Sequence, residues 1–184
     1  MSLSKKMHRI TFLLILTVGM LMLATGNAAQ PIVRWLSFSE AEELARKEPR
    51  KFFVDMYTNW CGWCKKMDAT TFSDSIIANY LNKKYYPVKF NAEQRDTIFF
   101  AGKSYTFIAT GNRGFHELAV EWAGERLSFP TIIFLDEYGK LIQAIPGYRN
   151  AQELHAILVY FGDNYYRMMS WDQFKQSYHS PFPR

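Results

Sequence analysis

The sequence predicts an α/β domain with a central mixed β-sheet flanked by helices. Two apolar strand segments, 51–57 and 85–91, are separated by helical sequence, so they form a strand–helix–strand unit with parallel pairing. Two further strand segments, 131–135 and 141–145, are joined by a short turn and form an antiparallel hairpin. An amphipathic helix over 150–161 follows the hairpin. The order β-α-β, β-hairpin, α therefore leads to a sheet with both kinds of pairing.

The N-terminal segment is predicted to be a targeting signal rather than part of the domain. An uninterrupted apolar run, 10–24, is followed by small residues that suit cleavage after Ala28. Three basic residues precede the run: Lys5, Lys6 and Arg9. The run is shorter than the ~20 residues of a membrane-spanning helix, which makes an uncleaved anchor the weaker alternative. We expect residues 1–28 to be a signal peptide and the protein to be periplasmic or secreted.

The charge balance does not suggest a nucleic-acid partner. The chain has 22 basic and 17 acidic residues, for a net charge of +5. Three of the basic residues and none of the acidic ones lie in 1–28, which leaves 19 against 17, or +2. That charge is too small for a basic surface that binds nucleic acid. A hydrophobic content of 48%, with 17% aromatic residues, is ample for a folded core.

The first helix and strand of the domain follow from local signals. A helix is expected from Ser39, with Glu42 completing a capping box, and Pro49 ends it. The segment 51–57 is apolar almost throughout, which is typical of a strand covered on both faces. After this strand and a short connection, residues 64–72 are predicted to be helical.

A second helical segment begins after Ser73 or Asp74, either of which can cap it, and leads into the strand 85–91. The next part, up to Gly124, is less regular. It contains a hairpin centred on 101–103, a loop over 109–114 and a short helix, 115–123, that ends at Gly124.

The C-terminal helix is the most strongly patterned element. Asn150 and Glu153 provide a capping box, and Gly162 fits its C-terminal end. Its apolar residues recur at helical spacing: Leu154, Ile157, Leu158 and Phe161. The tail, 169–184, is expected to add one short helix.

Cys61 and Cys64 are the only cysteines of the chain, and their spacing suits a clip, half of a metal site or a redox couple. A structural clip is disfavoured, because so small a loop removes little entropy from the unfolded chain. Metal binding is also disfavoured, since zinc sites need three or four protein ligands. The histidines beyond the apolar run have no paired spacing: His116, His155 and His179. We expect no metal and no cofactor.

Four features in register resemble the thioredoxin superfamily. The stretch WCGWCK contains the cysteine pair, and Asp55 stands six residues before Cys61, where thioredoxins carry a buried acid. Lys89 occupies the position of the lysine near that acid, and Pro130 that of the family's cis-proline. The stretch that runs from the pair to residue 91 is similar to the branch that contains the C-terminal domain of bacterial membrane disulfide reductases.

The resemblance implies a thioredoxin fold over residues 29–161. Two segments depart from the small thioredoxins. One is an insertion before the cis-proline strand, at about 95–114, and the other is a C-terminal extension, 162–184. Both leave the choice of partner open.

The resemblance also implies the roles of the redox residues. Cys61, at a helix start, is expected to be the exposed nucleophile, and Cys64 the more buried resolving thiol, the two forming a disulfide. Asp55 is expected to be a buried proton acceptor with a raised pKa, and Lys89 to tune it. The alternatives are a solvent-facing Asp55 near the strand end and a solvated Lys89 at a strand edge.

Substrate binding is expected beside the dithiol. In the family, the peptide bond before the cis-proline presents the backbone of the preceding residue, here Phe129, to an extended substrate chain. The residues expected to bind substrate are Trp60, Gly62, Trp63, Phe129 and Pro130, with Tyr148 a further candidate for the apolar rim.

These expectations combine into a function: a thiol–disulfide oxidoreductase of the cell envelope that reduces or exchanges disulfides in exported proteins. Its partners would be protein thiols or disulfides and a membrane or periplasmic electron donor. The reductive direction is favoured because Trp63, rather than a histidine, precedes Cys64 and stabilises a thiolate less. The alternative is a binding or chaperone-like module on the same fold, with little redox turnover.

Overall fold

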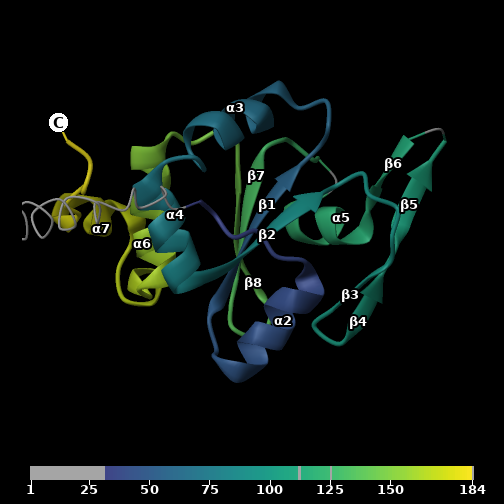
Figure 1. The fold of residues 1–184 in the computed structure, drawn as a ribbon, viewed down its shortest axis with the longest axis horizontal. Helices are drawn as coiled ribbons and strands as arrows, with labels where there is room; N and C mark the ends of the chain where they lie inside the picture. The colour runs from purple at the N-terminus through teal and green to yellow at the C-terminus, as the bar shows by residue number, and fades with distance from the viewer. Residues whose placement is uncertain (1–31, 112, 125, 184) are drawn as a thin grey trace, which may run out of the picture. The chain divides into compact units, whose positions relative to one another are not determined.

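A four-stranded mixed sheet lies at the centre of the computed structural model (Figure 1). The structure describes residues 32–111, 113–124 and 126–183, so the expected signal peptide lies outside the described residues. The spatial order of the strands is β2 (Tyr85–Asn91), β1 (Lys51–Tyr57), β7 (Thr131–Leu135) and β8 (Leu141–Pro146). β1 pairs in parallel with β2, and the β1–β7 and β7–β8 pairs are antiparallel. The predicted mixed sheet is confirmed.

β1 is apolar on both sides because helices cover both faces of the sheet. Phe52, Val54 and Met56 point into one core, and Phe53 points into the other. Since side chains alternate along a strand, Asp55 lies on the same face as Phe53. A period-two pattern of apolar and polar residues is absent here for that reason.

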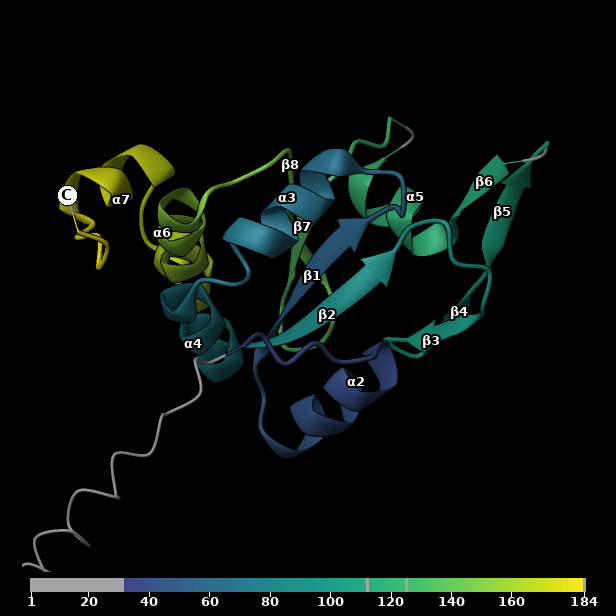
Figure 2. The ribbon, with the colours of Figure 1, turned by 45° about the horizontal axis from the view of Figure 1, so that its top comes forward.

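Two helical layers enclose the sheet (Figure 2). Buried side chains of the first core come from α2 (Phe38–Lys47) and α5 (Glu117–Ala123). Those of the second core come from α3 (Gly62–Thr70), α4 (Ser75–Lys84) and α6 (Ala151–Gly162). The break between α3 and α4 is at Asp74, whose carboxylate accepts the backbone N–H groups of Ile76 and Ile77.

The start of α2 differs from the sequence expectation by two residues. Ser37 is the N-cap, and its hydroxyl accepts the N–H of Glu40 at 3.3 Å. Glu40 in turn accepts the N–H of Ser37 at 2.7 Å, so the capping box is Ser37/Glu40 and the prediction of Ser39 was wrong. The physical reason is Phe38, which is buried and therefore belongs to the apolar face of the helix.

The segment between β2 and α5 folds as two hairpins rather than one. The first is β3 (Ile98–Phe100) with β4 (Lys103–Tyr105), as predicted. The second is β5 (Phe107–Thr110) with β6 (Arg113–His116), where the prediction of a loop and an earlier helix start was wrong. Its strands have four residues each and include Gly114, so they carry too little local pattern to be detected.

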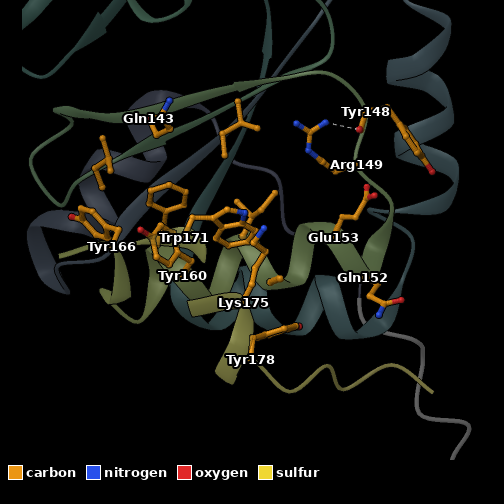
Figure 3. A pocket seen from close by; sticks show the side chains of 15 residues that line it. Gln143, Tyr148, Arg149, Gln152, Glu153, Tyr160, Tyr166, Trp171, Lys175 and Tyr178 are labelled. Atoms are coloured by element: carbon orange, nitrogen blue, oxygen red, sulfur yellow. Dashed lines mark hydrogen bonds between the residues drawn. The ribbon is translucent and has the colours of Figure 1, made fainter. Parts of the chain in front are cut away.

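The C-terminal segment packs against α6 through η2 (Tyr165–Arg167) and α7 (Trp171–Ser177). Phe174 of α7 is buried and lies 5.2 Å, ring to ring, from Tyr160 of α6. β8, α6 and α7 border a cavity of about 980 Å³ that aromatic side chains line (Figure 3). These include Tyr148, Tyr160, Tyr166, Trp171 and Tyr178.

Within the described ranges, none of the helices has both the length and the apolar character needed to span a bilayer.

Candidate active site

The two cysteines lie where β1 gives way to α3. The loop after Tyr57 turns back so that the N–H of Cys61 donates to the carbonyl of Thr58 at 3.1 Å. Cys61 is the N-cap of α3, and its sulfur accepts the backbone N–H of Cys64 at 3.0 Å. Cys61 and Cys64 are joined by a disulfide. The first turn of a helix has backbone N–H groups without intrahelical partners, and here the Cys61 sulfur takes the place of a capping oxygen.

The electrostatic environment at this helix end favours negative charge on the Cys61 sulfur. The N-terminus of a helix carries the positive end of its dipole. The first turn of α3 contains no acidic side chain to offset that potential, and Lys65 and Lys66 follow the pair directly. A thiolate released from the disulfide at Cys61 is therefore stabilised by the helix itself.

Both sulfurs are shielded in the disulfide form. Cys61 is 4% exposed and Cys64 is 2% exposed. The expectation of an exposed Cys61 does not hold for this form. Cys61 is the more exposed of the two cysteines, but only slightly.

Asp55 is buried in β1, the strand that leads into the cysteine pair, with 1% of its surface exposed. Its register partner in β2 is Lys89, whose Nζ lies 2.6 Å from Asp55 Oδ2. Burial raises the pKa of Asp55 from 3.8 to about 6, although Lys89 acts in the opposite direction. The second oxygen, Oδ1, is buried and has no hydrogen-bond partner among the described residues. The alternative of a solvent-facing Asp55 is therefore wrong.

Lys89 connects two elements of the site. Besides Asp55, its ammonium group donates to Asp68 of α3. Burial lowers the pKa of Lys89, but Asp55 and Asp68 together raise it above the ordinary value, so Lys89 remains charged. Its ammonium also lies about 5 Å from the ring centroids of Trp35, Tyr57 and Phe72.

Asp68 was not singled out from the sequence, although one signal was present. It stands four residues after Cys64 on α3, and residues spaced by four share a helix face. An acid on the face of the resolving cysteine therefore lies toward the Asp55–Lys89 pair.

Trp63 and Tyr148 form one side of the mouth of the site. Trp63 is 57% exposed, and its ring lies 5.4 Å from that of Tyr148. Lys66 Nζ lies 4.8 Å from the Trp63 ring and 5.3 Å from the Tyr148 ring. The Tyr148 hydroxyl is 3.2 Å from that of Thr70 in α3, so the loop after β8 is joined to the helix that carries the pair.

Trp60 and Phe129 form the other side. Trp60 is 65% exposed, its indole N–H donates to Glu93 at 3.0 Å, and its ring meets the Phe129 ring edge-on at 5.8 Å. The Phe129–Pro130 peptide bond is cis, and Pro130 is buried. Within the described ranges, the backbone N–H and C=O of Phe129 have no hydrogen-bond partner. Gly62 is exposed, and a side chain there would enter open space.

The site residues expected from the sequence thus lie on converging elements. β1 and β2 hold Asp55 and Lys89, α3 holds the cysteines, and the loop before β7 holds Pro130. Trp60 and Trp63 are exposed next to the cysteines, and Phe129 contacts Trp60. The arrangement combines a dithiol couple, a buried acid–base group and an exposed apolar rim.

Comparison with known proteins agrees with this geometry. Residues 38–162 match the family model described as a thioredoxin-like domain. The "Thiol:disulfide interchange protein DsbD" of Pectobacterium atrosepticum is 31% identical over 117 residues, which cover 62% of this chain and 17% of that protein. An uncharacterized protein of Archaeoglobus fulgidus is 29% identical over 63 residues, 34% of this chain and 50% of that protein. This chain therefore spans at most half the length of either relative.

Two solved structures have the same fold. The structure titled "DsbH Oxidoreductase" has a TM-score of 0.52 at 17% identity, over 75% of this chain and 89% of that one. A thioredoxin from Thermus thermophilus has a TM-score of 0.51 at 20% identity, over 68% and 84%. The family model spans well over half of the sequence and includes both cysteines, Asp55, Lys89 and Pro130. The chain therefore belongs to the thioredoxin-like domain family.

Proposed function

We propose that this protein is a thiol–disulfide oxidoreductase of the cell envelope that reduces or exchanges disulfides in exported proteins. The observation that carries the proposal is the placement of the Cys61–Cys64 disulfide at the N-terminus of α3, with the Cys61 sulfur accepting a backbone N–H. A helix start that stabilises a thiolate suits disulfide exchange, whereas a structural clip has no need of it.

In the first step, the Cys61 thiolate of the reduced protein attacks one sulfur of a substrate disulfide. A Cys61–substrate bond forms, the substrate S–S bond breaks, and the second substrate sulfur leaves as a thiolate. In the second step, the Cys64 thiolate attacks the Cys61 sulfur. The Cys61–Cys64 disulfide forms and the first substrate sulfur leaves, so the substrate gains two electrons and the protein loses two.

Asp55 is the group proposed to take the proton from Cys64. With a pKa of about 6, its carboxyl is largely ionised at neutral pH, and the unpartnered Oδ1 offers a lone pair. Lys89 limits the cost of that buried charge and is itself held by Asp68. Asp68 therefore acts on the reaction as a positioning residue, through Lys89.

Phe129 is proposed to bind the substrate backbone. Its N–H and C=O are available for short β-type pairing with an extended chain beside the pair. Trp60 and Trp63 supply apolar contacts on either side. The open surface at Gly62 leaves room for the substrate chain to approach the Cys61 sulfur.

The direction and the compartment are supported by sequence rather than by geometry. Trp63 lacks the second donor nitrogen and the charge of a histidine, which favours a reducing over a strongly oxidising couple. The basic and apolar N-terminal pattern favours export. The DsbD relative is named for thiol:disulfide interchange, and its similarity supports protein thiols and disulfides as the partners.

Two variants test the reaction. Cys61→Ser is expected to abolish reduction of a disulfide peptide, because the attacking sulfur is gone. Cys64→Ala is expected to accumulate a mixed disulfide with the substrate, visible as a mass increase that a reducing agent removes. Turnover that survives in Cys61→Ser would contradict the proposal and favour the binding-module alternative.

The direction is tested separately by equilibrating the protein in glutathione buffers and measuring the oxidised fraction of the cysteine pair. A reductase is expected to have a potential close to the ~−270 mV of thioredoxin. A value near about −120 mV would mark a strong oxidant and would overturn the reductive direction while leaving thiol–disulfide exchange intact.

A further inference from the structure

A line of aromatic rings runs from the cysteine pair to the inserted hairpin β5–β6. Trp60, which precedes Cys61, meets Phe129 at 5.8 Å between ring centroids. Phe129 in turn lies 5.9 Å from Phe115 of β6. The hairpin is therefore in contact with the residue proposed to bind the substrate backbone, although it is remote from the cysteines in sequence.

The face of the hairpin that meets Phe129 continues as an exposed apolar surface. Ile108 of β5 is directly opposite Phe115 in the strand register, so the two side chains share one face. Ile108 is 45% exposed. We call Trp60, Phe129, Phe115 and Ile108 the apolar strip. Figures 1 and 2 show that the hairpin projects away from the central sheet, at the end of the domain opposite α6 and α7.

The opposite face of the hairpin fixes it to the domain. His116 is fully buried, and its backbone N–H donates to the carbonyl of Ala92 at 2.8 Å. Its Nε2 lies 3.2 Å from the Asp96 carbonyl oxygen and its Nδ1 accepts the N–H of Leu118 at 3.3 Å. Because a carbonyl oxygen only accepts, Nε2 carries the hydrogen and the ring is neutral.

Two further features fix the geometry of the apolar strip. At Gly114, where φ is +158°, a Cβ atom would collide with the carbonyl oxygen of Ile108, so the close approach of β5 and β6 requires glycine. The Trp60 indole N–H donates to Glu93, at the root of the insertion. The apolar strip is therefore ordered before any partner binds, which lowers the entropic cost of binding.

The outer end of the same face is cationic. Thr110 and Arg113 form the register pair two positions beyond Ile108 and Phe115, so they lie on the same face, and both are exposed. Arg113 has no ion-pair partner within the described part of the chain. This end therefore suits a neutral or acidic polypeptide segment better than a basic one.

We propose that the hairpin face carrying Phe115 and Ile108 binds the polypeptide substrate at a distance from its reactive disulfide and selects an apolar side chain there. The inference rests on the proposed function and adds a substrate class to it. Phe129 to Phe115 spans 5.9 Å, and Ile108 lies about 5 Å further, across the strand pair. At about 3.3 Å per residue of extended chain, the apolar side chain lies roughly three or four residues from the substrate residue that pairs with Phe129, beside the substrate cysteine.

The test uses the reduced full-length protein with two kinds of probe. One is 5,5′-dithiobis(2-nitrobenzoate), a small disulfide that reaches the cysteine pair but not the hairpin. The other is a set of polar peptides, each with one cysteine as a mixed disulfide with glutathione and one leucine moved stepwise along both sides of it. The second-order rate constant for oxidation of the wild-type protein is expected to rise about tenfold when the leucine stands three or four residues away on one side.

Ile108→Ser is expected to remove most of that leucine preference and to leave the rate with the small disulfide within twofold of wild type. In Ile108→Glu, the peptide with lysine in place of the best leucine is expected to become the better substrate. The matched control is Phe99→Ser, because Phe99 is 60% exposed on β3, in the preceding hairpin, and lies outside the apolar strip. This control is expected to keep the wild-type preference.

Two outcomes would overturn the inference while the proposed function stands. One is a wild-type rate that does not depend on the position of the leucine, and the other is an unchanged preference in both Ile108 variants. Failure of the function itself looks different, since the wild-type protein would then reduce none of the peptides faster than Cys61→Ser does.

Discussion

The carboxyl group of Asp55 has a pKa of about 6 in the folded protein, against an ordinary value of 3.8. Between these two values the folded state binds more protons at this group than the unfolded state does. Stability contributed by the group is therefore present at low pH and falls as the pH rises toward 6. Above pH 6 the charged carboxylate costs a constant ~3 kcal/mol of unfolding free energy.

Asp55→Asn is therefore expected to increase the free energy of unfolding of the oxidised protein at pH 8, by up to ~3 kcal/mol, and to change it little at pH 4. Lys89 keeps Asp68 as a partner, so the substitution does not leave its ammonium unpaired. Guanidinium denaturation at both pH values measures the difference. Asp68→Asn, a partly exposed acid of the same network, serves as the control. An equal gain at pH 4 and pH 8 would show that the buried charge is not the cause.

Trp63 is the residue on which the proposed reductive direction depends. In Trp63→His, a second donor nitrogen and a positive charge would stabilise the Cys61 thiolate and hence the reduced form. Charge-assisted hydrogen bonds contribute about 1.5–3 kcal/mol, so the potential is expected to rise by roughly 30–60 mV. Equilibration with glutathione measures it. Trp63→Phe keeps an aromatic ring without the donor and is expected to stay near wild type; an equal rise there would rule out the hydrogen bond.

Among single residues, the resemblance to thioredoxins identified Asp55, Lys89 and Pro130, because their spacing to the cysteines can be counted along the sequence. It did not lead to Glu93 or Asp68, whose contacts with Trp60 and Lys89 arise only when separate elements come together. Nor did it anticipate the burial of Cys61 in the disulfide form.

Among the elements, the N-terminus of α2 offers a direct comparison between two serines. Ser37 caps the helix in the structure, whereas Ser39 lies within its first turn. Ser37→Ala is expected to lower the free energy of unfolding by ~1 kcal/mol, through loss of the cap. Ser39→Ala, the matched control, is expected to change it by less than about 0.5 kcal/mol. Thermal and guanidinium unfolding check both values, and the opposite order would restore Ser39 as the cap.

The strands of the central sheet were predictable because each is an apolar run bounded by turn residues. β5 and β6 were not, since their stability comes from distant contacts rather than from their own sequence. Phe115 packs on Phe129, and His116 is held by Ala92 and Asp96. Short strands that depend on tertiary contacts have no local period by which they can be recognised.

For the molecule as a whole, the C-terminal segment contributes to the same folded unit. Phe174 is 3% exposed and meets the rings of Tyr160, Trp171 and Tyr165. We propose that residues 162–184 are an extension that stabilises α6 from its outer side. The apolar residues of this tail predicted a helix, but its packing against α6 could not be derived from them.

Phe174→Ala is expected to lower the free energy of unfolding of the whole domain by ~3 kcal/mol, as for other buried phenylalanines. Gln176→Ala, an exposed position of the same helix, is the control. Circular dichroism against denaturant is expected to give a single transition in both variants. An unchanged midpoint in Phe174→Ala, or a separate early transition for the tail, would show that the extension does not support the core.

The two exposed indoles at the mouth of the site have an optical consequence. Trp60 and Trp63 flank Cys61, and a disulfide close to an excited indole accepts an electron from it and suppresses its emission. Of the five tryptophans, these two are the ones adjacent to the cysteines in sequence. Reduction is expected to brighten the intrinsic fluorescence, and Trp60→Phe with Trp63→Phe to remove most of that change. The intrinsic fluorescence would then measure the redox state of the cysteine pair without an added label.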